Sequence, residues 1–137
     1  MRSQSGFTYL GVLLAIAILG IGLTAASEVW VTTARRQRME QLEWAAQQYV
    51  QAIGSYYEAS PSVKAYPRTL HDLTEDKRFV FVRRHLRQEY VNPFAGATGW
   101  ESVSTVDGGI RGLRAQVPGA GGTEKEIREF VYRPATR

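Results

Sequence analysis

The chain has 137 residues, of which 44% are apolar and 22% charged, which excludes both a disordered chain and one buried entirely in a membrane. It has no cysteine and only two histidines, so disulfides, cysteine zinc sites and thiol nucleophiles are excluded, and little remains for histidine catalysis. The formal net charge of +4 permits an anionic partner without requiring one. The length suits a single domain.

The N-terminal part of the sequence is strongly apolar. No charged residue occurs from Phe7 to Ser27, and every residue from Leu10 to Leu23 is apolar or glycine. About 20 apolar helical residues are enough to cross the hydrocarbon core of a bilayer, so we predict a membrane-spanning segment here. Three interpretations fit this run: a secretory signal peptide cleaved at the small residues 25–27, a plain N-terminal anchor, or a segment preceded by a short leader.

The residues before the run favour the third interpretation. The start of the chain, residues 1–6, is polar and basic, ends in Gly6, and is followed by Phe7-Thr8. This pattern resembles the leader of type IV prepilins, the class that contains pilins and the pseudopilins of type II secretion. The resemblance implies that a prepilin peptidase cleaves after Gly6 and methylates the new N-terminal Phe7.

The chain departs from the family at one position. The fifth residue of the mature chain would be Gly11, where family members usually carry glutamate. In the family this glutamate is thought to meet the N-terminal ammonium of a neighbouring subunit during assembly. Its absence suits a subunit at or near the filament tip, and a variant shaft subunit is the alternative.

The sequence after the apolar run predicts a continuation of the same helix. No helix breaker occurs before Pro61, so we predict that the helix extends to about residue 58. Apolar residues recur there at spacings of three and four, which is typical of an amphipathic helix packed on a core. These residues are Met39, Leu42, Ala46, Tyr49, Ile53 and Tyr56.

Residues 60–90 are predicted to contain loops and short helices. Thr69 and Asp72 have the spacing of an N-cap and the third residue of a helical turn. The apolar and basic stretch that follows predicts a short helix from about Val80. Further on, Asn92-Pro93-Phe94 resembles the Asp-Pro-Trp loop of pseudopilins.

Three candidate strands complete the chain, over residues 99–105, 109–116 and 127–133. Asp107-Gly108-Gly109 is typical of a hairpin turn between the first two. We predict a pilin-like α+β fold in which a long N-terminal helix, half in the membrane and half amphipathic, packs on a small antiparallel sheet. The predicted organisation is a leader over 1–6, a transmembrane half over 7–27 and a periplasmic domain over 28–137, with its sheet within 99–133.

The sequence offers no pattern for catalysis, and we predict that the chain is not an enzyme. It has no phosphate-binding loop and no nucleophile elbow. His71 and Glu75 are four residues apart, but a single pair at this spacing is common on a helix surface and does not make a metal site. We therefore predict no cofactor and no bound metal.

Calcium is the one metal that the resemblance suggests, because major pseudopilins bind calcium through an acidic loop near the C-terminus. The acidic residues of that region are Asp107, Glu124, Glu126 and Glu129. They lack the close spacing of an oxygen cage for calcium, so we expect no calcium site.

Basic residues gather in the second half of the chain. A basic patch is predicted from Arg78, Arg83, Arg84, His85 and Arg87, and the candidate strands add Arg111, Arg114, Arg128 and Arg133. Such a patch suits phosphate contacts, but aromatic residues do not alternate with the basic ones in an obvious base-stacking pattern. We expect ion pairs between subunits, or simple solvation, in preference to nucleic-acid binding.

The resemblance implies a structural subunit of a type II secretion pseudopilus, which forms a periplasmic filament that drives protein export. The alternative is a minor pilin of a type IV pilus or a DNA-uptake machine. The implied partners are other pseudopilin or pilin subunits, the prepilin peptidase and the inner-membrane assembly platform. The implied location is the bacterial inner membrane, with a single pass and the C-terminal domain in the periplasm.

Overall fold

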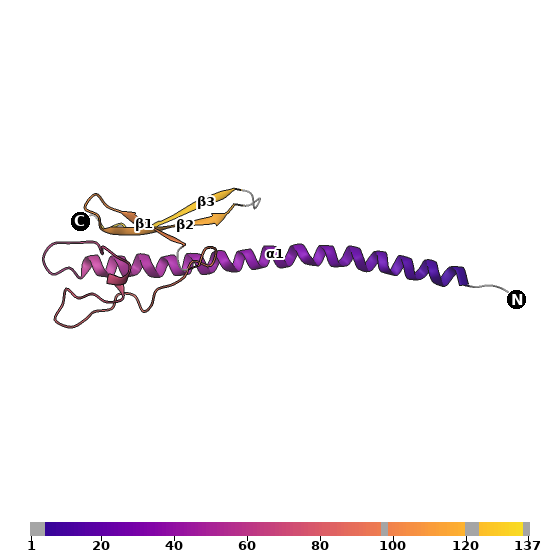
Figure 1. The fold of residues 1–137 in the computed structure, drawn as a ribbon, viewed down its shortest axis with the longest axis horizontal. Helices are drawn as coiled ribbons and strands as arrows, with labels where there is room; N and C mark the ends of the chain where they lie inside the picture. Colours follow the sequence, from indigo (N-terminus) through magenta and orange to yellow (C-terminus); the bar gives the residue numbers. More distant parts are fainter. Residues whose placement is uncertain (1–4, 97–98, 120–123, 136–137) are drawn as a thin grey trace. The chain divides into compact units, whose positions relative to one another are not determined.

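The structure is a computed structural model that describes residues 5–96, 99–119 and 124–135, without the side chains of residues 5–7 and 20–29. Its elements in chain order are α1 (Ser5–Glu58), the 3-10 helix η1 (His71–Leu73), β1 (Trp100–Ser104), β2 (Ile110–Pro118) and β3 (Lys125–Val131) (Figure 1). The chain divides into two compact units, Met1–Gln37 and Arg38–Arg137, and α1 contributes to both.

Helix α1 is continuous over 54 residues, as the absence of helix breakers predicted. Its last turn closes through hydrogen bonds from the Ala59 amide to the Ser55 carbonyl at 3.0 Å and from the Ser60 amide to the Tyr57 carbonyl at 3.3 Å. Pro61 follows at once, and a proline there prevents a further helical turn.

The predicted membrane-spanning half of this helix is wrong. Within the part of the chain that the structure describes, no helix is both long enough and apolar enough to cross a bilayer. The predicted α+β arrangement of one long helix and an antiparallel sheet is present, but the predicted division of the helix into a membrane half and an amphipathic half is not supported.

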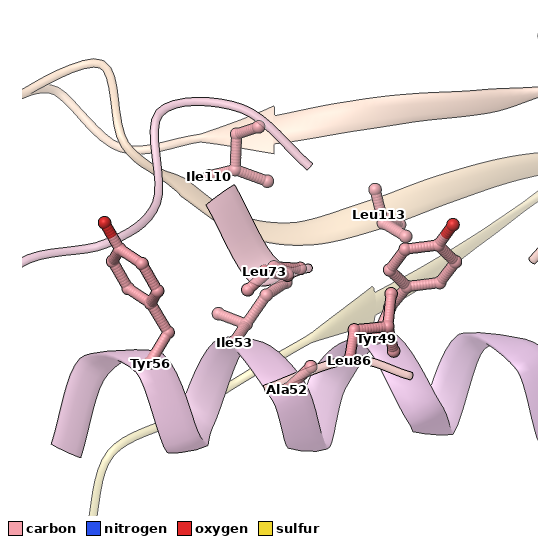
Figure 2. Close-up of a cluster of buried hydrophobic side chains, with 8 residues drawn as sticks. All are labelled: Tyr49, Ala52, Ile53, Tyr56, Leu73, Leu86, Ile110 and Leu113. Atoms are coloured by element: carbon pink, nitrogen blue, oxygen red, sulfur yellow. The ribbon is translucent and has the colours of Figure 1, made fainter. Parts of the chain in front are cut away.

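The predicted apolar stripe of the helix is confirmed as core. Leu42, Ala46, Tyr49 and Ile53 are buried, and Met39 packs partly buried beside them. The main cluster joins the helix to the rest of the unit Arg38–Arg137 (Figure 2). It consists of Tyr49, Ala52, Ile53 and Tyr56 from α1, Leu73 from η1, Leu86 from the following segment, and Ile110 and Leu113 from β2.

The sheet is antiparallel with the order β1-β2-β3, and its three strands lie close to their predicted positions. The central strand β2 alternates buried and exposed residues along most of its length, which fits a sheet with one face on the core. Leu113 pairs with Ser102 of β1 and with Phe130 of β3. A second small cluster forms where Ala115 and Val117 of β2 meet Leu42 of α1.

The hairpin between β1 and β2 uses the predicted turn. Gly108 has a φ of +78°, a conformation that glycine adopts without steric cost. Thr105 and Gly109 close the turn through a backbone hydrogen bond of 2.7 Å, and the Gly108 amide donates to the Thr105 carbonyl at 3.0 Å.

The side-chain bonds predicted for the turn near residue 70 form, although the 3-10 helix begins one residue later than predicted, with Leu70 and not Thr69 at its N-cap. The Asp72 amide donates to the Thr69 Oγ1 at 3.3 Å, and the Thr69 amide donates to the Asp72 Oδ2 at 2.9 Å. These reciprocal bonds satisfy amides that have no partner at the start of a helical turn.

The short helix predicted from about Val80 is wrong, because the backbone groups that it needs are used elsewhere. Asp76 and Arg83 exchange two backbone hydrogen bonds, at 2.8 and 3.1 Å, and so close the segment between them into a loop. The amides of His85 and Leu86 both donate to the Leu73 carbonyl, at 2.9 and 2.8 Å.

The Asn92 loop is a compact turn held by one buried side chain. The side-chain Nδ2 of Asn92 donates to the Gly99 carbonyl at 2.8 Å, and the Oδ1 of the same side chain accepts from the Phe94 backbone amide at 2.9 Å. Gly96 completes the turn with a φ of +71°. Asparagine suits this position because its side chain supplies both a donor and an acceptor.

Candidate functional site

The predicted processing residues lie at the start of α1. Gly6 and Phe7 are helical, but the side chain of Phe7 lies outside the described part of the chain. Gly11 is surrounded by open space, since a Cβ built on it meets no atom within 4 Å. Packing within the chain therefore does not require glycine at this position.

Residues 8–19 of α1 form what we call the apolar segment. Its large apolar side chains are between 46% and 69% exposed: Tyr9, Leu10, Val12, Leu13, Leu14, Ile16, Ile18 and Leu19. Successive residues of an α-helix are about 100° apart, so these side chains cover all sides of the helix. A continuous exposed apolar surface of this kind marks an interaction site.

A second cluster of chemically active residues lies at the C-terminal end of α1, in the other unit. We call it the Asp76 network, and it consists of Ser55, Ser60, Asp76, Arg78 and His85. The side chains of Asp76 and His85 are each 1% exposed, and that of Arg78 is 26% exposed. The network therefore lies mostly below the surface.

Arg78 is the centre of the network. Its Nε donates to the Asp76 Oδ1 at 2.9 Å, and its Nη2 donates to the Asp76 Oδ2 at 2.7 Å. The same guanidinium donates to the Ser60 Oγ at 2.7 Å and to the Tyr56 carbonyl at 3.0 Å. That carbonyl belongs to the last turn of α1, which lacks partners within the helix, so Arg78 supplies a donor and a positive charge where both are favourable.

His85 links the network to Ser55. Its Nε2 lies 3.1 Å from the Asp76 Oδ2, and its Nδ1 lies 2.8 Å from the Ser55 Oγ. An ionised carboxylate only accepts hydrogen bonds, so Nε2 carries a proton, and in the neutral imidazole Nδ1 then accepts from the serine hydroxyl. The resulting order of hydroxyl, imidazole and carboxylate is that of the serine hydrolase triad.

Two features make this arrangement unsuited to acyl transfer. In a triad the carboxylate stabilises the imidazolium, whereas here Arg78 already neutralises Asp76. The adjacent cleft, of about 450 Å³, is lined among the described residues by Asp76, Arg78 and Tyr56 but by neither Ser55 nor His85. The network instead suits a structural role, holding the segment after η1 against the end of α1.

The electrostatics of the network fit this structural role. Burial raises the pKa of the Asp76 carboxyl, but hydrogen bonds from Arg78 and His85 outweigh that effect and lower the pKa to about 2. The hydrogen bond to Asp76 raises the pKa of Arg78. The pair therefore stays ionised at neutral pH.

The structure divides the predicted basic patch. Arg78 and His85 turn into the Asp76 network, whereas Arg83, Arg84 and Arg87 are exposed. The role of Asp76 was not predicted, because the network around it is completed by Ser60, which bonds to Arg78, and by Ser55, which bonds to His85, and both serines are distant in sequence from these partners. A single acidic residue at the start of a basic stretch was the only available signal.

The arginines of the strands form ion pairs within the chain. Arg114 lies 2.9 Å from Glu129, and Arg128 lies 3.1 Å from Glu126 and 3.7 Å from Glu43 of α1. Two of the acidic residues considered for calcium are therefore paired with arginine.

The other candidate metal pair is loosely arranged. His71 lies 3.9 Å from Glu75 and 3.6 Å from Glu89, and all three side chains are well exposed. Among residues 5–96, 99–119 and 124–135, no group of three or more His, Cys, Asp or Glu side chains is arranged so that it could hold a metal ion.

Comparison with known proteins adds no further constraint, since the chain matches no protein-family model, no curated protein and no solved structure.

Proposed function

We propose that the chain is a structural subunit of a filament of the type IV pilin class, and specifically a pseudopilin of a type II secretion system. The observation that carries the proposal is the exposed apolar segment, in which Leu10, Leu14 and Leu19 are 66%, 63% and 67% exposed. Packing such helices side by side in a filament would remove this surface from water, which is favourable. The leader pattern that ends at Gly6-Phe7 supports the same assignment by resemblance.

The two parts of α1 differ in what covers them, and this difference also supports the proposal. The stripe that contains Leu42, Tyr49 and Ile53 is covered within the chain, where it packs on β2 and the segments before it. The side chains of the apolar segment remain exposed in the described chain. We infer that other molecules cover the apolar segment, and a filament of like subunits would provide this cover.

The proposal implies three kinds of partner: other subunits of the filament, a prepilin peptidase that cleaves after Gly6, and the inner-membrane assembly platform. It places residues 28–137 on the periplasmic side. The glycine at position 11 favours a minor subunit close to the filament tip, because it offers no carboxylate to the N-terminus of a neighbour.

Cross-linking within cells tests the proposal directly, because the chain has no cysteine of its own. Leu10 and Leu19 are nine residues apart, which places them on opposite sides of α1. We expect the double variant Leu10→Cys/Leu19→Cys, treated with a bismaleimide, to form a ladder with other subunits when peptidase and assembly ATPase are present. Mass spectrometry of the same protein should find an N-terminal methyl-phenylalanine at position 7.

Two controls make this experiment specific. The pair Val63→Cys/Val106→Cys places exposed thiols outside α1 and should give no ladder. Adding Gly6→Val to the first pair should block processing and abolish the ladder. A ladder that persists with Gly6→Val would contradict the proposal, since simple association of the apolar segments would then explain it. An intact Met1, or a mature start at Ser27, would also contradict it.

A further inference from the structure

The loop formed by residues 77–82 has a defined base. Asp76 and Arg83 close it through backbone hydrogen bonds of 2.8 and 3.1 Å. Below this closure the chain is buried, since the Asp76 side chain is 1% exposed and Leu86 is 3% exposed. Arg78 ties the loop to the last turn of α1 through the Tyr56 carbonyl. The loop therefore projects from a well-packed base.

The tip of this 77–82 loop is apolar and exposed. Val80 is 96% exposed, Phe81 is 85% exposed and Val82 is 59% exposed. None of these side chains can form a hydrogen bond, so in water they leave a contiguous apolar surface without compensation. Three successive large apolar side chains at a loop tip indicate a surface that is covered by a membrane or by another molecule.

Positive charge surrounds the tip. Five Lys or Arg residues and one acidic residue occur between positions 76 and 87, and the acidic one, Asp76, is neutralised below the surface by Arg78. Arg83, Arg84 and Arg87 have no ion-pair partner among the described residues, and the guanidinium carbon of Arg83 lies 5.5 Å from the centre of the Phe79 ring. The carboxylates at the edges of this region are already engaged, Glu75 with Lys77 and His71, and Glu89 with His71.

We propose that the 77–82 loop docks on an anionic lipid surface, with Val80, Phe81 and Val82 at the boundary between headgroups and acyl chains. Arg83, Arg84 and Arg87 then lie at the level of the lipid phosphates. Apolar side chains flanked by cations match such a surface, which combines hydrocarbon with negative charge. This inference concerns a different part of the chain from the filament proposal and does not depend on it.

Charge and chemistry favour lipid over the other possible occupants. A nucleic acid would satisfy the arginines but offers little to the aliphatic side chains of Val80 and Val82. A second copy of the chain carries a formal net charge of +4, so it does not complement the basic rim. Both alternatives are outcomes of the experiment below.

The experiment places a reporter at the tip of the loop in the full chain. Val82→Cys introduces the only thiol, which is then labelled with nitrobenzoxadiazole, whose emission shifts to the blue in an apolar environment. The labelled chain is mixed with vesicles of phosphatidylcholine alone or of equal parts phosphatidylcholine and phosphatidylglycerol. Because the readout is local to position 82, binding of vesicles elsewhere on the chain does not produce the signal.

We expect a blue shift with the anionic vesicles, little change with phosphatidylcholine alone, and a weaker response as salt is added. In the same labelled background, Arg84→Gln/Arg87→Gln should raise the lipid concentration for half the response about 30-fold. Phe81→Asp should abolish the response.

Two matched controls use the other exposed features of the chain. Val106 lies at the tip of the β1–β2 hairpin beside Asp107 and is fully exposed, so a label on Val106→Cys should not respond to either vesicle. Arg133 is exposed far along the sequence, and Arg133→Gln should leave the response at position 82 unchanged.

Four results would overturn the proposal. They are no blue shift with anionic vesicles, an equal shift for the label at position 106, an equal shift with phosphatidylcholine alone, and a shift that needs no vesicles. A vesicle-free shift that depends on protein concentration would indicate a second copy. One that depends on an added oligonucleotide would indicate nucleic acid.

Discussion

Arg78 contacts Tyr56 twice. Its guanidinium carbon lies 3.5 Å from the centre of the tyrosine ring, and its Nη2 donates to the carbonyl of the same residue at 3.0 Å. The first contact is a cation–π interaction, and the second satisfies the last turn of the helix. One side chain from the 77–82 loop thus fixes both the ring and the backbone at the end of α1.

Stability should depend on pH through Asp76. The pKa of this carboxyl is about 2 in the folded chain against an ordinary value of 3.8. A lowered pKa means that the stabilisation is present above pH 3.8 and is lost as the pH falls from there to about 2. The linked change is about 2 kcal/mol in the free energy of unfolding, measured by urea denaturation across this range.

Asp76→Asn isolates this contribution. At about pH 7 the variant should lose about 3 kcal/mol, because the guanidinium of Arg78 keeps its position without a carboxylate. The difference from the parent should shrink by about 2 kcal/mol at low pH, where the parent carboxyl is protonated. Asp107→Asn, in an exposed turn, should change stability by less than about 0.5 kcal/mol. A difference that stays constant with pH would show that folding does not lower the pKa of the Asp76 carboxyl.

Leu42→Ala should destabilise the unit Arg38–Arg137 by about 2–5 kcal/mol, because Leu42 is fully buried against Ala115 and Val117. Thermal and urea unfolding measure the loss. Val63→Ala, at an exposed position, is the matched control and should have little effect. An unchanged stability for Leu42→Ala would mean that the stripe on α1 is covered by another subunit and not by the sheet.

Gly112→Ala should disrupt the pairing of β2 with β3. A Cβ at this position would clash with the Phe130 carbonyl oxygen and would lie 2.8 Å from the Val131 Cα, both backbone atoms that cannot move without breaking the ladder. We expect a loss of about 1–3 kcal/mol or more in unfolding free energy. Gly11→Ala, where the Cβ meets nothing, should cause no loss. Equal stability of both variants would contradict this strand register.

Gly11→Glu separates a tip subunit from a shaft subunit of the proposed filament. The open space around Gly11 accommodates the larger side chain, so any effect reports on contacts with other molecules. For a tip subunit we expect secretion or filament yield to stay level or fall, because the new carboxylate gains no N-terminal ammonium as partner. Gly11→Gln keeps the shape without the charge and is the control. A clear rise in yield with Gly11→Glu alone would identify a shaft subunit.

The fold was predictable where the pattern is periodic or local. The spacing of Leu42, Tyr49 and Ile53 predicted a buried helix face, and Asp107-Gly108-Gly109 predicted the hairpin, because both signals depend on neighbours within a few turns or residues. The membrane-spanning half of the helix was predicted from the length of the uncharged apolar run over residues 7–27, and it is the part of the fold that the described structure contradicts.

The candidate site was harder to predict because its partners are distant in sequence. Arg78 and Ser60 are 18 residues apart, and Ser55 and His85 are 30 residues apart. The sequence does not distinguish a basic residue that bonds to a distant buried acceptor from one that is solvated. For this reason Arg78 and His85 were grouped with Arg83 and Arg84. The loop between Asp76 and Arg83 was missed for a similar reason, since its Val and Phe residues suit a strand or a helix equally well when their long-range bonds are unknown.

The order in which the core is built has a consequence for synthesis on the ribosome. Tyr49 bonds to the backbone of Tyr90 across 41 residues, and the Tyr132 hydroxyl reaches Glu58 across 74. The apolar face of α1 is therefore translated long before β2 and β3 exist to cover it. Until nearly the whole chain has emerged, that face is open to nonspecific association, so a nascent chain of this kind benefits from a chaperone that shields helices before their sheet arrives.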